Sequence, residues 1–130
     1  MGQFNGNNFA IGIDIERVKR FEKLNKTNPL INGIFSKEEV DYCFSKKFYA
    51  QHLAARYCAK EALVKAFCSL GFEQFQYADF EIKKCQNGAP IIKVLNYHDL
   101  TTEEINNFKI EVSLSHTKDN AIAQVFVIKE

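Results

Sequence analysis

The pattern of apolar and polar residues predicts a strand near the start of the chain and a long helix near its middle. Residues 9–15 alternate, with isoleucines at 11, 13 and 15 on one face and Gly12 and Asp14 on the other, as is typical of a strand. Residues 49–70 carry apolar side chains on nearly every side at helical spacing, and Gly71 provides a natural stop. The sequence therefore predicts a helix that is enclosed by the rest of the protein.

Shorter elements surround these two, and their order predicts the fold class. Pro29 and Gly33 interrupt the stretch that follows the expected helix over 17–24. The other expected elements are a helix over 17–24, a helix over 38–44 begun by the capping box of Ser36 and Glu39, a hairpin over 80–95 turned at Asn87-Gly88, a short helix begun by the capping box of Thr101 and Glu104, and strands over 110–115 and 121–128. This order predicts an α+β fold with a mostly antiparallel sheet wrapped around the long helix. We expect one domain over residues 9–130, preceded by a loose leader at residues 1–8.

Composition and charge exclude several classes of protein. The net charge of +1 over 130 residues is too low for a purely electrostatic nucleic-acid binder. No apolar run approaches the roughly 20 residues of a membrane span, and the polar start shows no secretory signal. None of the four cysteines forms a CxxC pair, so we expect reduced thiols, no structural zinc and a cytoplasmic location.

Four charged residues interrupt the long apolar helix. Arg56 and Lys60 are spaced i, i+4 and have like charge, which is favourable if an anion such as a phosphate lies over them. A solvated surface stripe explains the same spacing. Glu61 and Lys65 have the favourable order for an intrahelical ion pair, and this pairing is the simplest account of them.

Acidic residues on the first strand suggest a cation site. Asp14 lies on the same face as Gly12, which leaves room there, and Glu16 shares that face. If Asp14 met Glu61 across a cleft, the two carboxylates would form a hard oxygen site suited to Mg²⁺. The alternative for Asp14 is a helix N-cap for the following segment. The segment from Ser115 to Lys118 ends a strand, where it suits either phosphate contacts or an ordinary turn.

Four segments together resemble the holo-acyl-carrier-protein synthases, which are small 4′-phosphopantetheinyl transferases. These segments are IGIDIERVKRF, FSKEEVDYC, ARYCAKEALVKAF and VSLSHTKDNAIAQV, and they occur in matching order from residue 11 to 127. The combination of GIDI with AKEALVKAF is the most specific part. The resemblance implies the 4′-phosphopantetheinyl transferase fold and transfer of 4′-phosphopantetheine from coenzyme A to a serine of apo acyl carrier protein. The by-product would be adenosine 3′,5′-bisphosphate.

The resemblance also implies roles for particular residues. Asp14 and Glu61 would bind Mg²⁺, with Mn²⁺ as an alternative metal and Glu16 as a further candidate ligand. The expected catalytic residues are Asp14, Glu61 and Lys65, and either Glu61 or a metal-bound water would take the serine proton. Coenzyme A, the co-substrate, would contact Arg56, Lys60, Lys65, Ser115, His116, Thr117 and Lys118.

Partners follow from the same resemblance. It implies a homotrimer with active sites at subunit interfaces and an acidic acyl carrier protein as substrate. On the expected helix over 17–24, Lys19 and Lys23 fall on one face with Arg20 alongside, so these three are the predicted docking residues. A solvated basic face is the alternative. Two other classes compete with the transferase: a non-catalytic module that binds coenzyme A or a nucleotide, and a basic-helix nucleic-acid binder. The presence of both Asp14 and Glu61 disfavours the first, and the low net charge disfavours the second.

Overall fold

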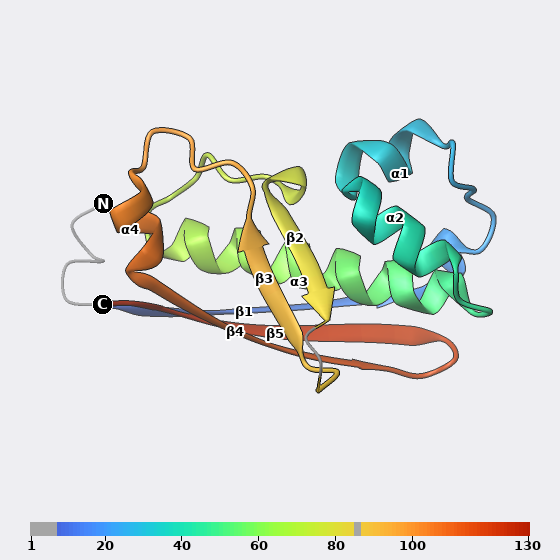
Figure 1. Cartoon of the computed structure of the whole chain (residues 1–130). Helices are drawn as coiled ribbons and strands as arrows, with labels where there is room; N and C mark the ends of the chain where they lie inside the picture. Colours follow the sequence, from blue (N-terminus) through green and yellow to red (C-terminus); the bar gives the residue numbers. More distant parts are fainter. Residues whose placement is uncertain (1–7, 85–86) are drawn as a thin grey trace.

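A long helix lies between a three-stranded sheet and a two-stranded hairpin (Figure 1). The computed structural model describes residues 8–84 and 87–130. The helix is α3, Tyr49–Ser69. The sheet has the antiparallel order β1-β5-β4, and the hairpin pairs β2 with β3; the strands are β1 (Phe9–Arg17), β2 (Phe80–Lys84), β3 (Pro90–Val94), β4 (Phe108–His116) and β5 (Asn120–Lys129). The predicted α+β class and the predicted strands are confirmed.

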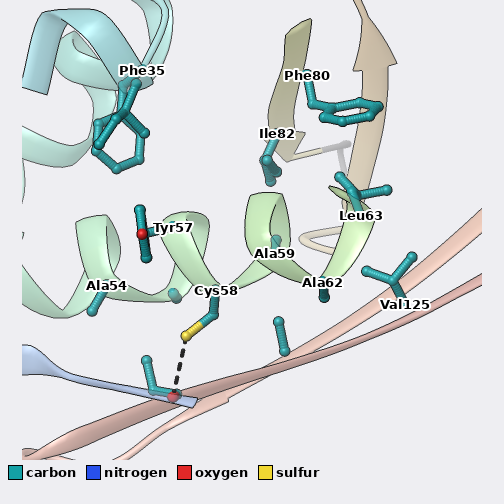
Figure 2. Close-up of a cluster of buried hydrophobic side chains, with 14 of the residues drawn as sticks. Phe35, Ala54, Tyr57, Cys58, Ala59, Ala62, Leu63, Phe80, Ile82 and Val125 are labelled. Atoms are coloured by element: carbon teal, nitrogen blue, oxygen red, sulfur yellow. Dashed lines mark hydrogen bonds between the residues drawn. The ribbon is translucent and has the colours of Figure 1, made fainter. Parts of the chain in front are cut away.

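Small side chains allow α3 to lie close to the sheet. Cys58 and Ala62 point toward β1 and β5, and the thiol of Cys58 donates a hydrogen bond to the carbonyl of Ala121 at 3.3 Å (Figure 2). On the opposite side of α3, the larger side chains of Phe80 and Ile82 come down from β2. Both layers bury the helix, which explains why its sequence is apolar on almost every side.

Gly12 brings β1 into unusually close contact with α3. A Cβ atom at this position would lie 1.8 Å from the carbonyl oxygen of Ala62, so no side chain fits. Asp14 is two residues further along the same face of the strand, and it is therefore also carried toward the helix. The isoleucines of β1 point the other way, as predicted, and Ile13 is 54% exposed.

The predicted helix over 17–24 is wrong. Only a 3₁₀ turn, η2 (Val18–Phe21), forms there. Val18 and Phe21 are both buried. Because they are three residues apart, a single 3₁₀ turn is enough to place both side chains in the core. Arg17 offers no side-chain cap for a longer helix. As a consequence, the basic residues of this segment do not share one helical face.

The predicted interruption at Pro29 and Gly33 is also wrong, because helix α1 (Pro29–Ile34) lies there. The side chain of Asn28 accepts a hydrogen bond from the backbone of Leu30, and Pro29 occupies the first turn, where its missing N–H costs nothing. These are the ordinary start signals of a helix. A helix of only six residues is too short to show a clear helical periodicity of apolar residues.

The capping boxes predict the other short helices well. Helix α2 (Lys37–Phe44) has Ser36 as its N-cap and helix α4 (Thr102–Asn106) has Thr101, each with both capping-box hydrogen bonds formed. A second 3₁₀ turn, η3 (Tyr77–Asp79), leads into β2. Residues 1–7 of the predicted leader lie outside the described residues, and so do residues 85–86 of the hairpin. Among the helices that are described, none combines the length and apolarity needed to cross a membrane.

Candidate active site

Asp14 lies where β1 crosses α3, and one of its oxygens has no partner. The ammonium of Lys65 is 3.3 Å from Oδ1 of Asp14 and also donates to the carbonyl of Ile13 at 3.0 Å. The second oxygen, Oδ2, is buried and makes no hydrogen bond within the described part of the chain. A buried carboxylate oxygen without a partner is costly, so this atom is well suited to accept a cation. The alternative role of Asp14 as a helix cap does not apply, because Asp14 lies within β1.

Glu61 is on the same side of α3 as the residues that contact Asp14. Cys58 and Lys65 both interact with Asp14, and they lie one turn before and one turn after Glu61. Burial, followed by the nearby carboxylate of Asp14, raises the pKa of the Cys58 thiol to about 12. Because Asp14 interacts with residues on both sides of Glu61, it faces the stretch of α3 that carries Glu61.

Glu61 does not form the predicted bond with Lys65. Instead its Oε1 accepts a hydrogen bond from the hydroxyl of Tyr77 on η3, while Lys65 is bonded to Asp14. The hydrogen bond to Glu61, with burial as a second cause, raises the pKa of the Tyr77 phenol. Tyr77 is therefore a hydrogen-bond donor at neutral pH. No feature of the sequence indicated this contact, because Tyr77 and Glu61 lie on different elements.

The two acids fit a Mg²⁺ ion that completes its coordination with other ligands. Mg²⁺ is commonly bound by one or two carboxylates together with phosphates and water. Across residues 8–84 and 87–130 there is no group of three or more His, Cys, Asp or Glu side chains that could hold a metal. Glu16, the further candidate ligand, is instead paired with Arg20 at 2.8 Å. Asp14 and Glu61 thus stay the predicted donor pair, and Glu16 is already engaged by Arg20.

Lys60 requires a correction, since the anion that compensates it is a carboxylate of the protein itself. Its side chain is fully buried, and its ammonium lies 2.7 Å from Oε1 of Glu39. Three backbone carbonyls share its remaining donors, those of Ile34 at 2.9 Å, Phe80 at 2.6 Å and Tyr77 at 3.3 Å. Burial lowers the pKa of Lys60, and the charge of Glu39 opposes this shift. With its three donors occupied, Lys60 has none free for coenzyme A.

Arg56 has a different environment. It is 4% exposed, and its guanidinium lies 4.4 Å from the centre of the Tyr42 ring. Lys46 and Lys84 also lie over this ring, at 4.8 and 5.6 Å. Nε of Arg56 and the hydroxyl of Tyr42 are both buried without a hydrogen-bond partner among the described residues. We call the residues Tyr42, Lys46, His52, Arg56 and Lys84 the Tyr42 cluster.

The positive charges of the Tyr42 cluster favour the binding of an anion. Burial raises the pKa of Tyr42, but the close approach of the Lys84 ammonium to the phenol oxygen, together with the charges of Lys84, Arg56 and Lys46, outweighs burial and lowers the pKa below its ordinary value. Burial and then the charge of Arg56 lower the pKa of His52 to about 4, so this imidazole is neutral at pH 7. The cluster therefore combines excess positive charge with an Arg56 Nε that has no hydrogen-bond partner in the described part of the chain, and both features favour a phosphate.

The four residues of the predicted segment from Ser115 to Lys118 have different surroundings in the structure. His116 lies at the end of β4, with its ring centre 6.2 Å from that of His52, so it adjoins the Tyr42 cluster. Ser115 points to the opposite face of the sheet, as adjacent strand residues do. The hydroxyl of Thr117 accepts hydrogen bonds from the turn that follows, at 3.1 and 3.2 Å. Lys118 lines a cleft of about 670 Å³ together with Lys47, and this cleft lies beside the start of α3.

Comparison with known proteins identifies the class to which this fold and site belong. Residues 10–125 match the family model described as the 4′-phosphopantetheinyl transferase superfamily. The chain therefore belongs to that superfamily, and it is a transferase enzyme.

Its relatives define the group more narrowly. A holo-[acyl-carrier-protein] synthase from Clostridium kluyveri is 38% identical over 116 residues, which cover 88% of this chain and 86% of the relative. Another from Geobacter metallireducens is 36% identical, with 90% and 94% covered. A crystal structure of the Bacillus anthracis holo-(acyl-carrier-protein) synthase in complex with CoA (3′,5′-ADP) superimposes with a TM-score of 0.73 at 26% identity, covering 93% of this chain and 96% of that one. The resemblance to holo-acyl-carrier-protein synthases is confirmed.

Proposed function

We propose that this enzyme transfers 4′-phosphopantetheine from coenzyme A to a serine of apo acyl carrier protein in the cytoplasm and releases adenosine 3′,5′-bisphosphate. The observation that carries the proposal is that Asp14 of β1 interacts with the residues one turn before and one turn after Glu61 on α3, while its buried Oδ2 makes no hydrogen bond in the described part of the chain. The Bacillus anthracis relative described above was crystallised with CoA (3′,5′-ADP), and a Helicobacter pylori relative with coenzyme A. Both observations favour coenzyme A as the co-substrate.

The chemistry requires positioning and charge compensation more than a covalent role for the protein. The serine oxygen forms a bond to the phosphorus of the 4′-phosphopantetheine, the bond from that phosphorus to the bisphosphate breaks, and a base takes the serine proton. Asp14 and Glu61 would hold Mg²⁺, or Mn²⁺ in its place, and the metal when bound would neutralise charge on the pyrophosphate. Lys65 is half-exposed beside Asp14, where its ammonium can approach the same phosphates.

Coenzyme A has a second anchor in the Tyr42 cluster. Among the residues that the structure describes, Nε of Arg56 and the hydroxyl of Tyr42 have no hydrogen-bond partner there, and His116 lies at the edge of the cluster. The exposed lysines of the cluster can attract the phosphates of the cofactor from solution. Of the other predicted contacts, Lys118 faces the cleft beside α3, and Ser115 and Thr117 stay predictions. Lys60 is no longer among the proposed ligands.

Intact mass measurement tests the reaction directly. Apo acyl carrier protein is incubated with the enzyme, coenzyme A and Mg²⁺, and we expect the carrier protein to gain the mass of one 4′-phosphopantetheine on its serine. A carrier protein in which that serine is replaced by alanine is the control. If no acyl carrier protein gains mass while coenzyme A still binds, the chain is a coenzyme A-binding module and the proposal is wrong.

The outer face of the sheet favours assembly with other copies. Its residues point away from α3 and are almost all apolar along β1 and β5, namely Phe9, Ile11, Ile13, Ile15, Ile122, Phe126 and Ile128. The four from β1 are 53–62% exposed. A contiguous apolar face of this kind is unusual for a monomer. We propose that it is covered in a homotrimer whose active sites lie at subunit interfaces.

The variant Ile13→Lys is expected to dissociate this assembly, because it places a charge at the centre of the apolar face. Light scattering after size-exclusion chromatography should show a mass close to that of one 15.0 kDa chain. Ile91→Lys is the matched control, because Ile91 is 49% exposed on β3, away from this face. The homotrimer proposal is wrong if the unmodified protein is monomeric or if Ile13→Lys assembles as the unmodified protein does.

Arg20 is the proposed centre of carrier-protein docking. Its guanidinium is 2.8 Å from Glu16 and 4.8 Å from the centre of the Tyr57 ring, and its side chain is 48% exposed. The hydrogen bond with Glu16 raises the pKa of Arg20, so the charge is permanent. Lys19 and Lys23 are also exposed, and each adds positive charge to the segment after β1, which favours an acidic partner.

Reversing the charge at Arg20 should change the KM for carrier protein and not the KM for coenzyme A. Arg20→Glu is expected to raise the KM for carrier protein by at least about tenfold, since opposed charges become like charges, and to leave the KM for coenzyme A nearly unchanged. Lys93→Glu, an exposed lysine on β3, is the control for the change of net charge. Equal losses for both substrates in steady-state kinetics would show that the docking assignment is wrong.

A further inference from the structure

Glu61 is held by a tyrosine hydroxyl that the proposed chemistry does not itself use. Oε1 of Glu61 accepts the hydrogen bond of Tyr77, and within the described residues Oε2 makes none. We propose that Tyr77 is a positioning residue for Glu61, which fixes one carboxylate oxygen so that the other is presented to the metal ion. This inference rests on the proposed metal site. It assigns Tyr77 no contact with the substrate or with the reacting atoms.

Tyr77 is itself held firmly from both ends. Its backbone carbonyl accepts a hydrogen bond from the ammonium of Lys60 at 3.3 Å, while its hydroxyl reaches Glu61, the next residue of α3. Its ring lies 5.4 Å from that of Tyr57, which is 6% exposed. Two consecutive helix residues and a buried ring therefore determine where the hydroxyl of Tyr77 points.

The turn that carries Tyr77 is also anchored. Within η3, the carboxylate of Asp79 accepts a hydrogen bond from the backbone of Gln76 at 2.8 Å and lies 2.7 Å from a ring nitrogen of His98. A donor on such an anchored turn can restrict a glutamate, whose free side chain has many rotamers. Fixing the carboxylate before the metal arrives removes part of the ordering cost of binding.

The carboxylates of Asp14 and Glu61 have the same arrangement of hydrogen bonds. Asp14 has Oδ1 bonded to Lys65 and Oδ2 unpartnered, and Glu61 has Oε1 bonded to Tyr77 and Oε2 without a hydrogen bond among the described residues. In each case one oxygen is fixed by a side chain from another element and the second is left for a ligand. Such outer hydrogen bonds commonly orient metal-binding carboxylates.

The variant Tyr77→Phe tests this role, because it removes the hydroxyl and keeps the ring. We expect the full-length variant to bind Mn²⁺ alone about tenfold more weakly, measured from the electron paramagnetic resonance signal of free Mn²⁺. The Mg²⁺ concentration for half-maximal transfer should rise by a similar factor, while the KM for carrier protein is unchanged. Tyr97→Phe, a half-buried tyrosine near β3, is the matched control and should bind Mn²⁺ as the unmodified protein does.

The background Glu61→Asp separates positioning from a general structural effect. The shorter side chain does not reach the hydroxyl, so adding Tyr77→Phe should then cause little further loss of Mn²⁺ affinity. The inference is overturned if Tyr77→Phe binds Mn²⁺ normally, or if it weakens binding equally in both backgrounds. Glu61→Gln in the same titration tests the metal site itself. If Glu61→Gln binds Mn²⁺ normally, the proposed metal site and the role of Tyr77 both fail.

Discussion

Replacing Asp14 by Asn or Glu61 by Gln is expected to lower the rate of pantetheinyl transfer by about 10³-fold. Each variant removes one negative charge from the donor pair and leaves the shape of the side chain unchanged. A metal ion contributes several kcal/mol of charge stabilisation to such a transition state, and about 4 kcal/mol corresponds to this factor. Single-turnover transfer measured by intact mass gives the rate without interference from product release.

The fold should tolerate both changes. The ion pair of Asp14 with Lys65 is 3.3 Å long and its lysine is half-exposed, so its contribution to stability is small. Substitution removes no hydrogen bond from Oδ2 of Asp14, because this atom makes none within residues 8–84 and 87–130. Glu103→Gln, an exposed acid on α4, serves as the control and should keep full activity. If either active-site variant retained more than a tenth of the activity, Asp14 and Glu61 would not be the essential metal ligands.

Local sequence signals predicted most of the secondary structure, and they failed where tertiary contacts decide it. Alternation gave β1, and two capping boxes gave the starts of α2 and α4, because these signals act within a few residues. The segment after β1 has helical composition, yet it forms only one turn, because the burial of Val18 and Phe21 fixes the path of the chain. No local pattern contains that information.

Part of the candidate site could likewise be predicted from local sequence signals, and part could not. The face shared by Gly12 and Asp14 could be predicted because strand residues alternate, and the structure adds that Gly12 is needed for contact with Ala62. The partners of the charged residues in α3 could not be predicted. The partner of Lys60 is Glu39, on α2, and the partner of Glu61 is Tyr77, on η3. Spacing within one helix cannot show which residue of another element will face it.

Glu39 shows how a correctly predicted residue can have an unpredicted second role. As part of the capping box it accepts a hydrogen bond from the backbone of Ser36 at 2.9 Å. The same carboxylate accepts the backbone N–H of Ile82 and pairs with Lys60. One buried ion pair thus joins α2, α3 and the beginning of β2. The like-charged spacing of Arg56 and Lys60 therefore has two separate explanations: Lys60 stabilises the fold through Glu39, and Arg56 is part of the Tyr42 cluster.

Replacing Lys60 by Met is accordingly expected to destabilise the fold by about 3–5 kcal/mol, because it leaves the carboxylate of Glu39 buried without a counter-charge. Urea unfolding followed by circular dichroism measures the loss. The double variant Lys60→Met with Glu39→Gln should recover part of the stability, since neither remaining side chain is charged. Under conditions where it is folded, Lys60→Met should bind coenzyme A almost as the unmodified protein does, whereas Arg56→Ala should bind it more weakly. A Lys60→Met protein with unchanged stability and weakened coenzyme A binding would restore Lys60 as a ligand and contradict its structural assignment.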